Sequence, residues 1–216
     1  MAGEIDERAG DAYYNEFYKE GGWSYSYWRE WWWHWRHVVR RFGLGRGLRV
    51  LEVACGSGFH TNLLNRMGFD CVGVDRSESG IEWARRRYPR SSYHRCDFRE
   101  MPFDEASFDV VFARGFSYYH YDLASVEAHE ATDTLMSYVR PGGVFVMIIA
   151  TDLSGKREPG RIWQNTLDDY RDHFSSFSKY WAADWVKGVA ICALWNVPAA
   201  APATLDAQRA LTAAPA

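Results

Sequence analysis

The sequence has few cysteines, no long apolar run and little net charge. Its four cysteines, Cys55, Cys71, Cys96 and Cys192, show no paired spacing, which predicts reduced, semi-buried side chains. No apolar segment approaches the length of a membrane span, and the first residues lack the apolar core of a signal peptide. The formal net charge of -3 argues against a nucleic-acid partner. We therefore expect a cytoplasmic protein, a monomer or homodimer, with no membrane or nucleic-acid partner.

Aromatic residues, in contrast, are abundant: they make up 17% of the chain and include 11 tryptophans. A chain of 216 residues suits one domain with a full-sized core. We expect that domain over residues 1–198, in which residues 1–46 form an aromatic-rich N-terminal helical lid. Residues 199–216 are rich in Ala and Pro, and this composition predicts a disordered tail.

The segment before residue 46 predicts two helices, over 6–19 and 26–42, separated by Gly21-Gly22. In the second helix, apolar residues recur at helical spacing and predict a stripe that packs onto the rest of the domain. Its members are Trp28, Trp31, Trp32, Trp35, Val38, Val39 and Phe42. Trp33 falls on the charged side, so we expect it either at a partner surface or in the wall of a substrate pocket.

The most informative stretch runs from Leu48 to His60. An apolar strand is followed by a glycine turn and then by the start of a helix, an arrangement in which a ligand can approach backbone N–H groups closely. A dinucleotide-binding turn would carry a third glycine where this chain has Thr61. Glu52 would also repel a pyrophosphate, whereas it would attract a ligand that carries an ammonium and a sulfonium. This charge pattern favours S-adenosylmethionine as the cofactor.

The stretch Glu52-Val-Ala-Cys-Gly-Ser-Gly58 resembles motif I of the class I S-adenosylmethionine-dependent methyltransferases, with Ala54 at the position of the first glycine. Strands expected over 70–75, 92–98 and 108–113 follow, separated by helical segments. Arg140-Pro-Gly-Gly143 before a strand over 144–149 also resembles the family. The resemblance covers residues 48–150. Beyond it, a helix over 166–174 and a hairpin of strands 180–186 and 189–197 match the antiparallel end of the family's sheet.

The expected fold is therefore α/β: a Rossmann-like, mostly parallel seven-stranded sheet with helices on both faces and an antiparallel C-terminal hairpin. Asp75 ends the second strand and is expected to bind both ribose hydroxyls, although a helix-capping role is the alternative. By resemblance, Asp97 and Phe98 are assigned to the adenine. The full set of expected cofactor-binding residues is Tyr14, Glu52, Ala54, Gly56, Gly58, Asp75, Arg76, Asp97, Phe98 and Arg114.

Catalysis is expected in the loop 114–121, because ligands of open α/β sheets bind beyond the carboxyl ends of the strands. Methyl transfer is an in-line displacement, so orientation supplies much of the catalysis. His120 is the candidate base, and the alternative is that it only packs among tyrosines. Tyr118 and Tyr119, with Trp33, are the expected acceptor-binding residues. No histidine cluster of useful ligand spacing is apparent apart from His34 and His37, so no metal is expected.

These observations together predict methyl transfer from S-adenosylmethionine to an O or N atom of a small molecule that is aromatic or cationic. Two alternatives remain open. One is a dinucleotide-dependent oxidoreductase, which Glu52 and Thr61 disfavour. The other is a non-catalytic cofactor-binding protein that keeps the fold and uses the Trp-rich helix as an interface.

Overall fold

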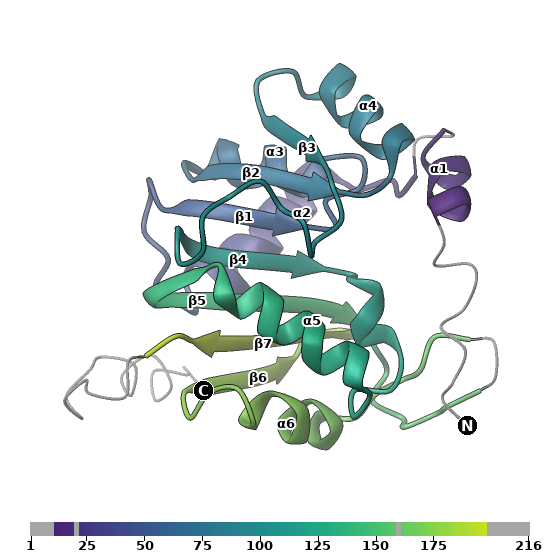
Figure 1. Ribbon diagram of the computed structural model, residues 1–216, viewed down its shortest axis with the longest axis vertical. Coiled ribbons are helices and arrows are strands. Elements are labelled where there is room, and N and C mark those ends of the chain that lie inside the picture. Colours follow the sequence, from purple (N-terminus) through teal and green to yellow (C-terminus); the bar gives the residue numbers. More distant parts are fainter. Residues whose placement is uncertain (1–10, 20–21, 159–160, 198–216) are drawn as a thin grey trace.

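The chain folds around one seven-stranded sheet, whose strands run across the view in Figure 1. The computed structural model describes residues 11–19, 22–158 and 161–197. The strand order is β3-β2-β1-β4-β5-β7-β6. The first five strands pair in parallel, and β7 pairs antiparallel with both β5 and β6. The strands are β1 (Arg49–Val53), β2 (Asp70–Asp75), β3 (Ser92–Arg95), β4 (Phe108–Arg114), β5 (Val139–Ala150), β6 (Trp181–Trp185) and β7 (Val189–Trp195).

Helices cover both faces of the sheet (Figure 1). On one face lie α2 (Tyr27–His34), the π-helical turn η2 (Trp35–Val39) that continues it, and α3 (Phe59–Met67). On the other face lie α5 (Val126–Ser137) and α6 (Leu167–Ser175). Helix α4 (Glu78–Arg87) packs against β2 and β3, and α1 (Asp11–Lys19) packs against α4. The short helix η3 (Ser117–His120) follows β4.

The alternation of side chains along β1 distributes its residues between two hydrophobic cores. Leu51 and Val53 belong to the core under α5 and α6, whereas Val50 belongs to the core under η2 and α3. Glu52 lies between Leu51 and Val53 in the strand, so its side chain points toward the α3 face, where it meets Thr61. A carboxylate is thereby placed in the interior at the end of the central strand.

The predicted fold class is confirmed, including the antiparallel C-terminal strands. Most boundaries agree within a few residues, and two differ more. Strand β3 ends at Arg95, three residues before its predicted end, and β5 begins at Val139, five residues before its predicted start. In β5 the extra residues follow a register shift opposite Phe108 and Val110, which accommodates the turn Arg140-Pro-Gly-Gly143 within the strand. The four cysteines are free, as expected, and three of them are buried.

The second helix exists, and the predicted stripe is buried at its end, at Val38 and Phe42, but not at its tryptophans. The side chains of Trp28 and Trp32 are 69% and 59% exposed, and Trp31 and Trp35 are half-buried. The buried residues of α2 are Glu30 and His34, followed in η2 by Val38. The reason is that Glu30 and His34 find polar partners inside the fold, so their side of the helix faces inward and the tryptophans of the predicted stripe lie on the other side.

The expected lid divides into two parts. Helix α1 lies beside the carboxyl ends of the strands, whereas α2 and η2 lie on the sheet (Figure 1). Residues 6–10 of the first predicted helix and the tail predicted over 199–216 lie outside the described residues. Within the described part of the chain, no helix has both the length and the apolar character that crossing a bilayer would require.

Candidate functional site

A pocket of about 1010 Å³ lies at the carboxyl ends of β1, β2 and β4. Strands β1 and β4 are adjacent in the sheet, and here the strand order reverses its direction, which is where open α/β sheets bind ligands. Its wall is built from α1, the turn after β1, the ends of β2 and β4, the segment 96–98, the loop 115–121 and the loop 161–164. Most of the expected site residues therefore line one cavity.

The glycine turn between β1 and α3 has left-handed backbone at Ala54 (φ 58°), Gly56 (φ 52°) and Gly58 (φ 76°). A Cβ atom on Gly58 would lie 2.6 Å from the Cβ of Ala84, so only glycine fits there. Ala54 adopts a conformation that costs a residue with a Cβ atom about 1–2 kcal/mol, because its side chain crowds the following carbonyl. The turn thus keeps the shape of a glycine-rich loop although its first glycine is replaced.

Glu52 lies in the wall of the pocket and is only 1% exposed. Burial raises the pKa of its carboxyl group to about 8, against the hydrogen bond that the Thr61 hydroxyl donates and the attraction of Arg114. The group is therefore protonated at neutral pH in the free protein. A cation that entered the pocket would favour the ionised form.

Asp75 ends β2 and lines the pocket. Its two carboxylate oxygens each accept a backbone N–H, Oδ2 from Gly56 and Oδ1 from Ser77, both at 2.8 Å. These bonds fix the carboxylate beside the glycine turn, in the wall of the pocket. Ser77 is the residue that caps α4, since its hydroxyl accepts the N–H of Gly80.

Asp97 and Phe98 follow β3 and also line the pocket. Asp97 accepts hydrogen bonds from the backbone and side chain of Arg99, at 3.0 and 3.3 Å. Phe98 is buried, and its ring packs edge-on against Phe116 and Tyr118, with centroids 5.2 Å away in both pairs. A carboxylate and an aromatic ring thus lie together at the third strand end.

Helix α1 forms the wall opposite the sheet. Tyr14 lines the pocket, and the guanidinium of Arg76 lies 5.9 Å from the centre of its ring. Tyr18, one turn further, is buried over the glycine turn: a Cβ atom on Gly56 would lie 2.7 Å from the Tyr18 Cζ. The four aromatic side chains of this helix, which are Tyr13, Tyr14, Phe17 and Tyr18, therefore line the pocket, although Tyr13 is also 48% exposed.

Arg114 ends β4 and is held by the inward side of α2. Its Nη2 lies 3.3 Å from Glu30 Oε2, and its Nη1 donates to His34 Nε2 at 3.4 Å. The guanidinium also lies 5.6 Å from the ring centres of both Tyr25 and Trp33. These contacts fix a positive charge in the pocket wall, next to Glu52.

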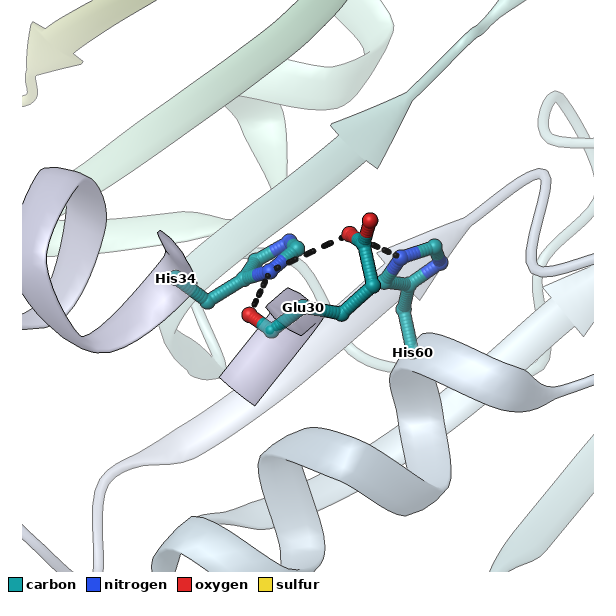
Figure 2. Close-up of side chains that lie close together, drawn as sticks. All are labelled: Glu30, His34 and His60. Carbon is teal, nitrogen blue, oxygen red and sulfur yellow. Dashed lines mark hydrogen bonds and ion pairs between the residues drawn. The ribbon is translucent and has the colours of Figure 1, made fainter. Parts of the chain in front are cut away.

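Figure 2 shows Glu30 between His34 and His60, with its carboxylate turned toward both imidazole rings. In the described part of the chain this is the one group of three side chains whose ligand atoms come within 4.8 Å of one another. His34 Nδ1–H donates to the Glu30 carbonyl at 2.8 Å, and His60 Nε2 lies 3.5 Å from the Glu30 carboxylate.

These three side chains are better suited to hold Arg114 by hydrogen bonds than to bind a metal ion. Burial holds the pKa of both His34 and His60 well below the ordinary value, so both rings are neutral. The proton on His34 Nδ1 leaves Nε2 as the acceptor, and Arg114 occupies it. The guanidinium also supplies the positive charge that the Glu30 carboxylate requires.

His120, the expected base, lies in η3 and lines the pocket. Burial lowers the pKa of its imidazole to about 4, although a backbone hydrogen bond with Gly115 acts in the opposite direction. Its Nδ1 atom is buried and has no hydrogen-bond partner among the described residues. A neutral ring with an unpaired nitrogen is suited to accept a hydrogen bond from a ligand.

The structure brings one of the two expected acceptor-binding tyrosines to the pocket. Tyr118 lines it and accepts a hydrogen bond from Arg99 at 2.7 Å. Tyr119 instead lies in the core, fully buried, with its hydroxyl 2.9 Å from that of Thr132. Trp33 does not reach the pocket either, because it packs against the core under α2, beside Arg114.

Several pocket residues were not anticipated from the sequence. His60 lines the pocket, and Glu30 and His34 hold Arg114 behind its wall. The sequence shows this group only in part, because Glu30 and His34 have i,i+4 spacing but His60 comes from another helix. The loop 161–164 carries no motif. A strand–turn–helix with three acidic strand ends, around a pocket at the switch point of the sheet, defines a nucleotide-type α/β site.

Comparisons with known proteins identify the class. Residues 50–143 match the family model of a methyltransferase domain. A probable S-adenosylmethionine-dependent methyltransferase of Mycolicibacterium smegmatis is 30% identical over 115 residues, which are 53% of this chain and 42% of that protein. A ubiquinone biosynthesis O-methyltransferase of Azorhizobium caulinodans is 35% identical over 85 residues, 37% of this chain and 33% of that protein. Among solved structures, the DhpI–SAH complex superposes with a TM-score of 0.68 at 20% identity, over 92% of this chain and 99% of that one.

Residues 50–143 therefore match a methyltransferase domain, and this part of the chain is similar to S-adenosylmethionine-dependent methyltransferases, the enzyme family that the sequence resembles. These matches support the expected family, enzyme class and cofactor. The curated relatives extend beyond the match, since it spans 42%, 50% and 23% of the lengths of the first three.

Proposed function

We propose that this chain binds S-adenosylmethionine in the 1010 Å³ pocket and transfers its methyl group to an O or N atom of a small molecule. The main support for this proposal is that a single cavity is lined by the glycine turn, by the three acidic residues at the strand ends, by His120 and by the loop 161–164. Its volume is at the upper end of the range for ligand pockets, which leaves room for an acceptor beside the cofactor.

The donor and acceptor groups of the pocket fit this cofactor. Glu52, Asp75 and Asp97 are hydrogen-bond acceptors at the ends of three adjacent strands, and they match an ammonium, two ribose hydroxyls and an exocyclic amine. Ala54, Gly56 and Gly58 shape the turn around which the cofactor would lie, while Phe98 would contact the adenine ring. Arg114 would face the carboxylate, and Tyr14 with Arg76 would close the ribose side.

S-adenosylmethionine supplies an electrophilic methyl group, so the chain has to orient the acceptor and receive or release its proton. His120 lines the pocket, and its neutral ring would accept a hydrogen bond from the acceptor's O–H or N–H group once its buried Nδ1 atom turned toward the cavity. Five further aromatic side chains line the pocket and expose ring faces to it: Tyr13, Phe17, Trp23, Tyr118 and Tyr121. Such faces bind flat rings and cations, which supports an aromatic or cationic acceptor.

Calorimetric titration and a turnover assay test this proposal. S-adenosylmethionine and its demethylated product should bind, and NAD should not, because the turn carries Thr61 where a dinucleotide-binding turn has its third glycine. Phenols and amines should then be screened as acceptors, with the methylated product identified by mass. Binding of NAD without binding of S-adenosylmethionine would contradict the cofactor assignment. Tight cofactor binding without turnover on any acceptor class would favour the non-catalytic alternative.

A further inference from the structure

The outward side of α2 and η2 carries an unusual concentration of exposed indole rings. Trp28, Trp31, Trp32 and Trp35 form what we call the aromatic ridge, and two of them are more than half exposed. Within it, Trp31 lies 5.2 Å from Trp32 and 6.4 Å from Trp35 between ring centres. The ridge lies along a continuous helix of 13 residues, about 20 Å long.

Positive charge accompanies the aromatic ridge. Arg29, Arg36 and Arg40 are exposed on the same helix, and Arg40 lies over the Trp35 ring at 5.8 Å. Neither Arg29 nor Arg36 has an ion-pair partner in the part of the chain that the structure describes. The one acidic residue of this helix, Glu30, is buried and paired with Arg114 on the opposite side. The outward side is therefore aromatic and cationic, with no acidic side chain of its own helix.

We propose that the outward side of α2 and η2 is a docking surface for a bilayer that contains anionic phospholipids. Tryptophan prefers the boundary between headgroups and acyl chains, because its ring is apolar and its N–H can be hydrated. Arginines beside it are attracted to anionic headgroups. Surface attachment requires no membrane-spanning run, so the lack of one in the sequence does not oppose it. This proposal is independent of methyl transfer.

Charge distinguishes this occupant from a second copy of the chain. A two-fold symmetric dimer through the aromatic ridge would bring two sets of unpaired arginines together, which is unfavourable. A nucleic acid would also be attracted by the arginines, but the four tryptophans favour an interface with apolar depth.

The test is co-sedimentation of the full chain with vesicles of phosphatidylcholine alone or mixed equally with phosphatidylglycerol. We expect binding to the mixed vesicles, weakened by salt, and little binding to phosphatidylcholine alone. Trp28→Ser/Trp32→Ser and Arg29→Gln/Arg36→Gln should each weaken binding about tenfold or more. Arg87→Gln/Arg90→Gln, two exposed arginines of the α4 end, makes the same charge change elsewhere and should bind as the unaltered chain does.

Each remaining result would overturn the proposal. Equal binding to both vesicle types, or equal loss in the Arg87→Gln/Arg90→Gln control, would show that this surface does not select anionic lipid. Self-association that the Trp28→Ser/Trp32→Ser variant abolishes, without vesicle binding, would assign the surface to a second copy. RNA binding that the same variants abolish, without vesicle binding, would assign it to nucleic acid. Circular dichroism and thermal melting of each variant verify folding, and the arginine pair provides a second test if the tryptophan pair unfolds.

Discussion

Asp75 presents its carboxylate to the pocket with both oxygens already anchored by backbone N–H groups. If this carboxylate binds the ribose hydroxyls, Asp75→Asn should weaken binding of S-adenosylmethionine and of its product at least tenfold, about 1.4 kcal/mol. The reason is that the amide loses the charge and replaces one acceptor by a donor. Isothermal titration calorimetry on the folded variant measures the change.

The matched control is Asp70→Asn, at the exposed start of the same strand. It removes the same charge from β2 but lies at the end of the strand away from the pocket. Its cofactor affinity should equal that of the unaltered chain. If Asp75→Asn also kept full affinity while folded, Asp75 would serve only to hold the glycine turn and the start of α4.

His120 should give a pH profile different from the one that its reference pKa suggests. A free imidazole titrates near pH 6.5, but burial lowers the pKa of His120 to about 4. Its protonation should therefore leave kcat/KM unchanged between pH 5.5 and 7 and reduce it only as the pH falls toward 4. Initial rates at low cofactor and acceptor concentrations measure the profile. A step near pH 6.5 that His120→Gln removes would show that the ring is charged more easily than its burial implies.

The same residue distinguishes proton transfer from positioning. If His120 takes a proton from the acceptor, His120→Ala should lower kcat by roughly 10²–10⁴-fold without changing cofactor affinity. His120→Gln should be equally slow, because an amide can orient an acceptor but cannot take its proton. Near-normal rates in His120→Gln would make His120 a positioning residue, and catalysis would then rest on orientation alone.

At the scale of elements, the link between α2 and β4 depends on the pair Glu30–Arg114. Glu30→Gln removes one partner and should destabilise the fold by about 2–3 kcal/mol, below the cost for a fully buried pair because the Arg114 side chain is 20% exposed. Urea denaturation monitored by circular dichroism measures the difference. Adding Arg114→Met should recover part of the loss, since the unpaired charge is then absent.

Glu16→Gln provides the comparison. Glu16 also pairs with a cation, Lys19, but both side chains are more than 60% exposed, so the loss should stay below about 0.5 kcal/mol. Equal costs for the two substitutions would mean that Glu30 contributes no more than a surface ion pair, and Arg114 would then be held by its aromatic neighbours instead.

The sequence predicted the strands well and the orientation of α2 badly, for a physical reason. Strand positions follow from local apolar runs that end at turns, and these are present in each segment alone. The buried side of α2 depends on Arg114 and His60, which lie 84 and 30 residues after Glu30 and meet it only in the folded chain. The periodicity of the sequence identifies an apolar stripe on the helix. It does not show that the polar side chains on the opposite side find hydrogen-bond and ion-pair partners inside the fold.

The same distinction applies to the site. Glu52, Asp75 and Asp97 could be placed from sequence because each lies at or within two residues of the end of a strand, and the carboxyl ends of parallel strands share one edge. The position of Tyr119 could not be predicted in this way. Tyr118 and Tyr119 are identical residues, and only the backbone conformation of η3 decides which ring enters the core.

At the scale of the whole molecule, buried histidines should lower the stability of the fold in acid, and the buried carboxyl group of Glu52 should lower it in alkali. Burial lowers the pKa of His34, His60, His120 and His173, so the unfolded chain binds more protons below pH 6.5 and stability falls as the pH falls. Burial raises the pKa of Glu52 to about 8, so the folded chain binds more protons than the unfolded chain between pH 4.5 and 8. The free energy of unfolding therefore decreases as the pH rises through this range. The melting temperature of the cofactor-free protein should be highest near pH 6.5.

Glu52→Gln isolates the alkaline side of this curve. The amide cannot ionise, so melting temperatures of the variant should stay level from pH 6.5 to 8, while those of the unaltered protein decline. Differential scanning calorimetry in buffers of equal ionic strength gives both curves. Parallel curves would indicate that Glu52 is already ionised in the free protein and that Arg114 compensates its burial.

The close packing of indole rings on α2 also has an optical consequence. Trp31, Trp32 and Trp35 lie with their centres 5.2 to 6.4 Å apart, one pair nearly parallel and two nearly perpendicular. Transition dipoles at such separations couple, and the coupled pair of bands should overlap the peptide signal in far-ultraviolet circular dichroism. Helix content read from that spectrum alone would be distorted. The same bands would report on the outer side of α2 without any attached dye, because loss of a single ring, as in Trp32→Ser, should remove most of them.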